Sequence, residues 1–106
     1  MDASMPHRAI LLHPDDNVAT ALTDLPVGEA VTVTLEDVTH TVTLRDDIAF
    51  GHKFALIPIP NGTPVLKYGL PIGNALEAIE PGAWVHVHNC RSERFGFRRE
   101  KYGLRA

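Results

Sequence analysis

The chain has 106 residues, of which 44% are apolar and 22% are charged. This length and composition predict one small globular domain and exclude a coiled coil, a collagen-like repeat and a disordered chain. The longest uncharged apolar run, residues 54–60, is too short to cross a bilayer, and residues 1–7 do not have the pattern of a secretory signal. The single cysteine, Cys90, excludes an intrachain disulfide. We therefore expect a cytoplasmic protein, whose small core favours a partner subunit or self-association.

The net charge of −3 is distributed unevenly along the chain. Residues 1–90 carry four basic and eleven acidic side chains, a balance of −7, whereas residues 91–106 carry six basic and two acidic side chains, a balance of +4. A basic tail can bind nucleic acid, but the body offers no basic face that a phosphate backbone could follow. We therefore expect a solvated tail or an arm for an acidic partner, and we do not expect nucleic acid as the partner.

Strands dominate the expected secondary structure. Residues 31–35 and 42–44 alternate Val or Leu with polar residues, which predicts a hairpin with one buried face. Residues 54–59, 65–68 and 84–88 read as further short strands, because they are apolar and rich in β-branched or aromatic residues. The order of these segments predicts a chain of short strands with tight connections.

Helix is expected in at most two short segments. In residues 16–25 the apolar residues recur at helical spacing, with Asp15 or Asp16 as a candidate N-cap. Residues 72–79 suggest a second short turn of helix, which Gly73 weakens. The expected fold class is therefore all-β, with one or two short helices.

A short rhythm recurs four times, in residues 25–28, 48–51, 59–62 and 79–82. Each segment begins with Leu or Ile and ends with Gly three residues later. Glycine supplies the positive φ that many turns require, and the apolar residue can anchor the turn in a core. The spacing between segments is irregular, so the rhythm predicts a compact, strongly bent β structure and not a solenoid.

The segment Trp84-Val-His-Val-His-Asn89 carries the strongest local group of chemically versatile side chains. On a strand, Trp84, His86 and His88 would share one side, while Val85 and Val87 would face the core. Two imidazoles at this spacing can reach one cation, since histidine is a common ligand of Zn, Fe and Ni. Two ligands do not complete a metal site, and an exposed strand face or an interface explains the same pattern.

Three further polar segments are candidate site residues. His13, Asp16 and Asn17 precede the first expected helix, where they either cap it or contribute a ligand or a proton-transfer group. His52 and Lys53 follow a turn glycine, and such a turn with a His and a Lys can bind a carboxylate.

Lys67 is a comparable candidate near the end of an expected strand, where it either binds a carboxylate or is solvated. Cys90 is expected to be inert. The sequence contains no phosphate-binding glycine loop, hydrolase elbow or dinucleotide fingerprint.

Four motifs, in this order, carry a family resemblance: residues 13–19 (HPDDNVA), 51–56 (GHKFAL), 67–73 (KYGLPIG) and 86–89 (HVHN). Together they resemble the SAF domain of the altronate/galactarate dehydratase family, and the chain is also similar to the small subunit of sulfolactate sulfo-lyase. The resemblance covers about residues 8–92 and implies a β-clip fold. The His-x-His pair points to the altronate or sulfolactate branch, because the galactarate branch lacks it.

The resemblance implies a function as the small subunit or N-terminal domain of an altronate dehydratase-like hydro-lyase. Such an enzyme dehydrates a sugar acid to a 2-keto-3-deoxy acid, and the resemblance implies a large catalytic subunit and iron(II) or another divalent metal in the assembled enzyme. The alternatives are the small subunit of a sulfolactate sulfo-lyase and a non-catalytic module that binds a carbohydrate acid or assembles a complex. We expect residues 1–92 to form the SAF-like domain and residues 93–106 to form a basic C-terminal extension. The expected substrate-binding residues are His52, Lys53, Lys67 and Asn89, and the expected metal ligands are His86 and His88.

Overall fold

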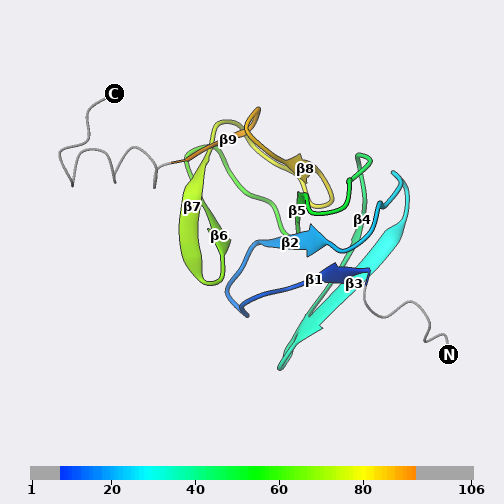
Figure 1. Cartoon of the computed structure of the whole chain (residues 1–106). Helices are drawn as coiled ribbons and strands as arrows, with labels where there is room; N and C mark the ends of the chain where they lie inside the picture. The colour runs from blue at the N-terminus through cyan, green and yellow to red at the C-terminus, as the bar shows by residue number, and fades with distance from the viewer. Residues whose placement is uncertain (1–7, 93–106) are drawn as a thin grey trace, which may run out of the picture.

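The structure, a computed structural model, describes residues 8–92, and within this range it contains nine short strands and no helix (Figure 1). In chain order the strands are β1 (Ala9–Ile10), β2 (Val18–Ala21), β3 (Ala30–Leu35), β4 (Val38–Thr43), β5 (Lys53–Ala55), β6 (Pro64–Lys67), β7 (Leu70–Ala75), β8 (Trp84–Val85) and β9 (Cys90–Arg91). The expectation of an all-β protein is therefore confirmed. Residues 8–92 contain no helix with the length and hydropathy that a membrane span requires. The expected basic extension, residues 93–106, lies outside the described residues.

The strands form three small antiparallel sheets. The central sheet has the order β1-β2-β5-β8, β3 and β4 form a separate hairpin, and the third sheet has the order β6-β7-β9. Figure 1 shows the β3–β4 hairpin on one side of the central strands and the β6–β7 hairpin on the other. The expected hairpin near residues 31–44 is thus confirmed.

Alternating burial explains why β3 and β4 pair as they do. Val31, Val33 and Val42 are buried on one face, and their β-branched side chains suit a pleated, half-buried surface. On the exposed face, the hydroxyls of Thr32 and Thr41 form a cross-strand hydrogen bond of 2.9 Å. A shift of one residue would move the valines to solvent, so the buried face sets the register.

Two pairs of main-chain hydrogen bonds bend the chain into this shape, and we call them the bridges. Leu25 and Ile48 each donate an N–H to the other's carbonyl oxygen at 2.8 Å, and Ile59 and Ile79 do the same at 2.9 and 2.8 Å. All four side chains are almost completely buried. The first bridge closes the segment that contains the β3–β4 hairpin, and the second closes the segment that contains the β6–β7 hairpin.

The recurring rhythm of Leu or Ile followed by Gly marks these bridges. The glycine of each segment has a φ between +85° and +92°, a region that L-residues other than glycine rarely adopt. The predicted role of these glycines in turns is therefore confirmed. Each glycine N–H donates to the carbonyl of the residue four positions before the partner segment begins, as Gly28 does to Leu44 and Gly51 does to Ala21.

Two hydrophobic cores lie on the two faces of the central strands. Ala19 and Phe54 belong to the core that contains the first bridge, whereas their neighbours Val18 and Ala55 belong to the core that contains the second. Because successive side chains of a strand point to opposite faces, β2 and β5 each contribute to both cores.

Both expected helices are wrong. Residues 16–25 form β2 and the bridge residue Leu25, and residues 72–79 form most of β7 and the bridge residue Ile79. β2 is buried on both faces and has no polar side, so its apolar residues also match helical spacing. In the second segment, Ile72, Ala75, Leu76 and Ile79 match helical spacing although they span the end of β7 and the loop that follows. β7 requires a glycine at position 73, because a Cβ there would overlap the carbonyl oxygen of Arg91 on the neighbouring strand β9.

The expected strand over residues 84–88 is too long, because β8 ends at Val85 and residues 86–89 form a turn. The placement of Val87 in the core is also wrong, since its side chain is 76% exposed. Residues 54–59 contain only the end of β5 before the chain turns toward the second bridge. Strands this short are below the length at which period-two alternation can be read reliably.

We expect Gly82→Ala to destabilise the domain far more than Gly62→Ala. Both glycines have a similar positive φ, so both substitutions strain the backbone by about 1 kcal/mol. A Cβ at Gly82 would also overlap the carbonyl oxygen of Thr43, whereas a Cβ at Gly62 meets no atom within 4 Å. The overlap should lower the free energy of unfolding of Gly82→Ala by about 2 kcal/mol more. Equal losses in urea unfolding of the two variants would contradict this packing.

Candidate functional site

Four aromatic rings gather where β5 and β8 pair, and we call them the ring cluster. His52 directly precedes β5, Trp84 begins β8, and His86 and His88 lie in the turn that follows. The Trp84 ring stacks on His86 at 5.1 Å between centroids, with an interplanar angle of 11°. His88 lies 5.0 Å from Trp84, and His52 lies 5.0 Å from His86. His86 and His88 therefore both lie against Trp84, but not on a shared strand face as predicted, because a turn and not a strand places them there.

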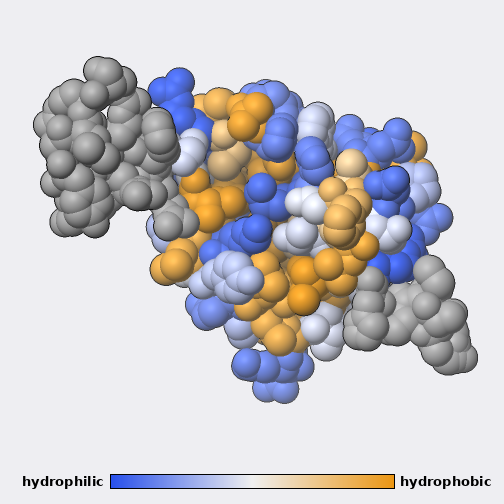
Figure 2. All heavy atoms as spheres, in the orientation of Figure 1, coloured by the Kyte–Doolittle hydropathy of each residue, from blue (hydrophilic) through white to orange (hydrophobic). Residues whose placement is uncertain are grey.

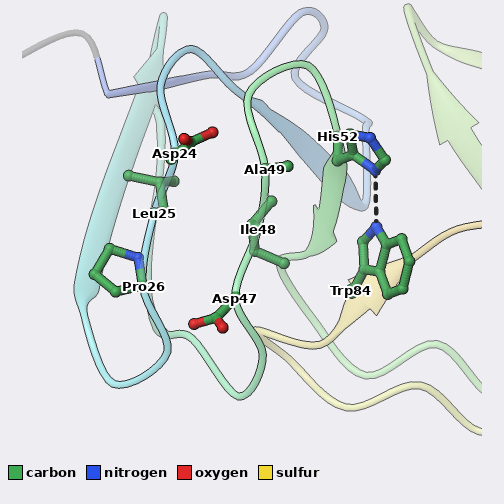
Figure 3. A pocket seen from close by; sticks show the side chains of 8 residues that line it. All are labelled: Asp24, Leu25, Pro26, Asp47, Ile48, Ala49, His52 and Trp84. Carbon is green, nitrogen blue, oxygen red and sulfur yellow. Dashed lines mark hydrogen bonds between the residues drawn. The ribbon is translucent and has the colours of Figure 1, made fainter.

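Hydrogen bonds fix the orientation of the indole. The Trp84 Nε1–H donates to Nδ1 of His52 at 3.1 Å (Figure 3). The Trp84 main-chain N–H donates to the carboxylate of Asp46 at 2.9 Å. An imidazole nitrogen that accepts a hydrogen bond carries no proton, so neutral His52 has its proton on Nε2. That N–H is the donor that His52 retains for a ligand.

Asn89 shapes the turn that carries the two histidines. Its side-chain oxygen accepts the N–H of His86 at 2.9 Å, and its amide nitrogen donates to the carbonyl of Trp84 at 2.8 Å. The residue is only 3% exposed. A substrate contact of Asn89 stays a prediction, and what the structure gives it is a role in positioning His86 and Trp84.

Two lysines, one of which lies near the ring cluster, have no neutralising partner among residues 8–92. Lys53 on β5 and Lys67 on β6 are half-buried, and neither forms an ion pair with another residue in the range 8–92. Burial and then the positive charge of Lys67 lower the pKa of Lys53, whereas Cys90 acts in the opposite direction. Burial raises the pKa of the Cys90 thiol, which agrees with the expected inertness of this cysteine.

The charges extend to the ring cluster through His86. Loss of solvation lowers the pKa of His86, and the neighbouring His52, Lys53 and His88 lower it further. We call Lys53, Lys67 and His86 the cationic cluster, in which Lys67 disfavours the positive charge of Lys53, and Lys53 disfavours that of His86. An anion bound here would relieve that repulsion.

His13, Asp16 and Asn17 contact the β6–β7 hairpin and cap no helix. The buried Asp16 carboxylate accepts the main-chain N–H groups of Tyr68 at 3.0 Å and Gly69 at 2.7 Å. Tyr68 has a φ of +59° and Gly69 one of +73°, so Asp16 holds the tight turn next to Lys67.

Asn17 makes a similar pair of hydrogen bonds to the main chain of β6. Its side chain accepts the N–H of Leu66 at 2.8 Å and donates to the carbonyl of Pro64 at 3.0 Å. The His13 ring lies against Gly69, where a Cβ would come within 2.8–3.0 Å of it. These three residues thus position the strand of Lys67, and a role for them as ligands stays a prediction.

The described residues do not form a complete metal site. His86 and His88 both lie about 5 Å from the Trp84 ring, but residues 8–92 contain no group of three His, Cys, Asp or Glu side chains that could hold a metal ion. These residues therefore do not fit a resident divalent metal by themselves. Their predicted role as metal ligands stays a prediction.

A hollow of about 600 Å³ lies beside the ring cluster, and we call it the bridge hollow. Residues 24–26 and 47–49 line it, together with His52 and Trp84 (Figure 3). Sequence reasoning missed Asp24 and Asp47. A signal was present, because an Asp precedes the bridge residue in the first two rhythmic segments, whereas Pro58 and Ala78 stand at the equivalent places of the other two.

Comparisons with known proteins agree with this geometry. The family model "Altronate/galactarate dehydratase SAF domain" matches residues 7–93. The chain is 54% identical over 83 residues to altronate dehydratase of Escherichia coli (strain K12), which is 78% of this chain and 16% of that protein. It is 38% identical over 63 residues to (2R)-sulfolactate sulfo-lyase subunit alpha of Paracoccus pantotrophus, 59% of this chain and 94% of that subunit. It is 37% identical over 78 residues, 72% of this chain and 14% of the relative, to galactarate dehydratase (L-threo-forming) of E. coli (strain K12). The predicted family resemblance is confirmed.

We expect Asn89→Ala to lower the free energy of unfolding by about 2 kcal/mol, because two buried main-chain partners lose their hydrogen bonds. Trp84 emission should shift as the turn loosens, and urea unfolding followed by fluorescence measures both effects. Asn61→Ala, at an exposed turn position, is the matched control and should change stability by less than about 0.5 kcal/mol. A wild-type unfolding midpoint for Asn89→Ala would show that the turn does not depend on this amide.

We expect His86 to titrate below the ordinary histidine pKa, and Lys53→Met to raise its pKa. The reason is that the Lys53 charge disfavours protonation of His86, although loss of solvation is the larger cause and persists in the variant. An NMR titration of the imidazole protons measures both midpoints, with His40 on β4 as the internal reference. A fall in the His86 pKa in Lys53→Met would contradict the proximity of the two groups.

Proposed function

Since this chain belongs to the altronate/galactarate dehydratase SAF domain family, we propose that it is the SAF-type part of an altronate dehydratase-like hydro-lyase. It acts together with a large catalytic region on a sugar acid, which loses water to give a 2-keto-3-deoxy acid. The aligned segment is 16% of the altronate dehydratase of E. coli, so the remaining catalytic groups belong to another part of the assembled enzyme. The 54% identity to that protein supports altronate as the substrate.

The observation that carries this proposal is the cationic cluster. Lys53 and Lys67 are half-buried and form no ion pair within residues 8–92, and His86 lies beside Lys53. A carboxylate bound by these groups gains charge-assisted hydrogen bonds and removes the repulsion between them. The carboxylate of the sugar acid is thus the ligand group that this surface suits best.

Binding the carboxylate in this way also assists the elimination. A base removes the proton on the carbon next to the carboxylate, the bond from the adjacent carbon to its hydroxyl breaks, and an acid protonates the leaving oxygen to give water. The resulting enol rearranges to the keto acid. Removing the proton places a second negative charge on the carboxylate end, and the Lys53 and Lys67 ammonium groups stabilise that charge. We assign no step to the divalent metal expected from the resemblance.

Exposed apolar side chains support a large partner. Several large hydrophobic residues reach the surface, and Figure 2 shows that they lie among hydrophilic residues on the face drawn there. The exposed residues are Ile10, Leu22, Val27, Phe50, Ile57, Tyr68, Leu70, Leu76 and Val87. The proposed large region would cover those of these side chains that lie next to one another, since contiguous exposed apolar patches mark surfaces that pack against further protein. The cytoplasmic location stays a prediction.

A sulfolactate sulfo-lyase is the second candidate. The aligned segment makes up 94% of the sulfo-lyase subunit alpha of P. pantotrophus, so that subunit consists of little more than this domain. A sulfonate is an anion, and the cationic cluster would also suit it. The identity of 38%, against 54% for altronate dehydratase, favours the first candidate.

We expect the purified 106-residue chain to have no altronate dehydratase activity, because its described residues do not supply a complete catalytic set. A chimera that carries residues 8–92 in place of the matching segment of the E. coli altronate dehydratase should dehydrate altronate. Turnover is measured as formation of the 2-keto acid. A folded chimera that is inactive on altronate but active on sulfolactate would favour the sulfo-lyase, and inactivity on both would favour a binding or assembly module.

In the active chimera, Lys53→Met and His86→Ala should each reduce turnover at least about tenfold, while the melting temperature changes little, because neither side chain is a core residue. His88→Ala tests the exposed end of the ring cluster in the same assay. His40→Ala is the matched control, because His40 takes no part in the ring cluster, and it should keep full activity. Full activity of the ring-cluster variants would remove the catalytic role proposed for them.

A further inference from the structure

The bridge hollow combines an apolar floor with polar groups around it. The buried bridge residues Leu25 and Ile48 lie at its base, and His52 and Trp84 form one wall (Figure 3). In Figure 3 the Asp24 carboxylate lies toward the top and the Asp47 carboxylate toward the bottom, with the bridge residues between them. A volume of about 600 Å³ is large enough for a small metabolite.

Each carboxylate keeps a free oxygen. One oxygen of Asp24 accepts the main-chain N–H of Phe50 at 2.8 Å, and one oxygen of Asp47 accepts that of Val27 at 2.9 Å. These two bonds are reciprocal across the first bridge and hold both side chains in place. The second oxygen of each carboxylate has no hydrogen-bond partner among residues 8–92, so each can accept a hydroxyl proton.

We propose that the bridge hollow is a subsite for the hydroxyl-bearing carbon chain of a sugar acid, an inference that rests on the proposed function and deepens it. The Trp84 ring offers an apolar face to the C–H groups of such a chain, and the Asp24 and Asp47 carboxylates accept its hydroxyl protons. Trp84 and the two aspartates thereby determine specificity for polyhydroxylated acids.

Other occupants suit the hollow less well. An apolar partner would take two carboxylates out of water without giving them hydrogen bonds, at a substantial cost in free energy. A metal ion needs ligands that converge, whereas Asp24 and Asp47 lie toward opposite ends of the hollow, and no group of three metal-ligating side chains occurs within residues 8–92. A hydroxylated chain satisfies the acceptors at both ends and covers the apolar floor between them.

The subsite shares His52 and Trp84 with the ring cluster, and His86 links the ring cluster to Lys53. His52 lines the hollow and lies 5.0 Å from the ring of His86, which in turn lies beside Lys53. A sugar acid whose carboxylate is bound near Lys53 can therefore extend its carbon chain along the ring cluster toward Trp84. The two ends of the ligand would thus be recognised by different groups, charge at one end and hydroxyl acceptors at the other.

Intrinsic fluorescence tests the subsite directly, because Trp84 is the single tryptophan of the chain. The full 106-residue chain is titrated with altronate, with altritol, which has the hydroxyls but no carboxylate, and with hexanoate, which has a carboxylate but no hydroxyls. We expect saturable changes with altronate and with altritol, and binding of altronate should be tightest. Failure of both hydroxylated probes to change the emission, or binding of hexanoate as tight as that of altronate, would overturn the proposal.

The variants Asp24→Asn and Asp47→Asn sharpen the test. Asparagine keeps an oxygen for the main-chain N–H but removes the charged acceptor from the hollow, so the fold should persist. Each variant should weaken altritol and altronate binding about tenfold. Asp37→Asn, in the exposed β3–β4 turn, is the matched control and should bind both probes as the unaltered chain does. Unchanged altritol affinity in both hollow variants would overturn the subsite.

The same variants in the chimera separate this inference from the proposed function. If the chimera turns over altronate and the hollow variants raise its KM, both the proposed function and the subsite are supported. If the chimera is active and the hollow variants keep the KM unchanged, the subsite is wrong while the function stands. If the chimera is inactive but altritol binding depends on Asp24 and Asp47, the function is wrong while the polyol site stands.

Discussion

The two main-chain bridges are the constraint from which the rest of the domain follows. Each bridge pairs two distant Leu or Ile residues through both their N–H and carbonyl groups and buries both side chains. A buried main-chain pair is costly to break, because its polar groups would have no water to replace the lost bonds. Each bridge therefore holds the base of one hairpin, and together they direct the chain between two cores. The first bridge also brings Asp24 and Asp47 to one hollow and places His52 next to it.

Buried polar residues hold the site in shape, whereas exposed and half-buried ones are available for ligands. The Asp16 side chain is hydrogen-bonded to main-chain groups of the turn after Lys67. The Asn89 side chain is hydrogen-bonded to main-chain groups of the turn that carries His86. The positive charge of Lys53 then has no neutralising partner among the described residues. This division explains how a small domain can present an unpaired cation without losing its fold, since the polar groups that position the cation are fully satisfied.

The four motifs that carry the family resemblance meet in pairs. The His13 motif holds the turn of the Lys67 motif through Asp16, and the His52 motif contacts the His86 motif in the ring cluster. The electrostatic influence of Lys67 on Lys53 joins the two pairs. Residues far apart in the chain thus form one surface, which suits the recognition of one small anionic ligand. In a lyase of the proposed kind, this surface would form a wall of a site that the large catalytic region completes.

Local patterns predicted much of this protein, and the limits of that prediction have a physical cause. The β3–β4 hairpin and the turn glycines were predictable, because alternation and positive φ are properties of a few consecutive residues. Trp84, His86 and His88 were predicted to share one face of a strand, but residues 86–89 form a turn held by Asn89, and this turn places both imidazoles against Trp84. The first helix was wrong because β2 is buried on both faces, which removes the polar face that distinguishes a strand from a helix. The second was wrong because apolar residues of β7 and of the segment that leads to the second bridge fall at helical spacing by coincidence. The hollow between Asp24 and Asp47 could not be read from the sequence, since only the pairing of Leu25 with Ile48 brings these carboxylates to one place. That pairing joins residues more than twenty positions apart. Burial of the whole core, and not a local sequence preference, determines that Leu25 pairs with Ile48.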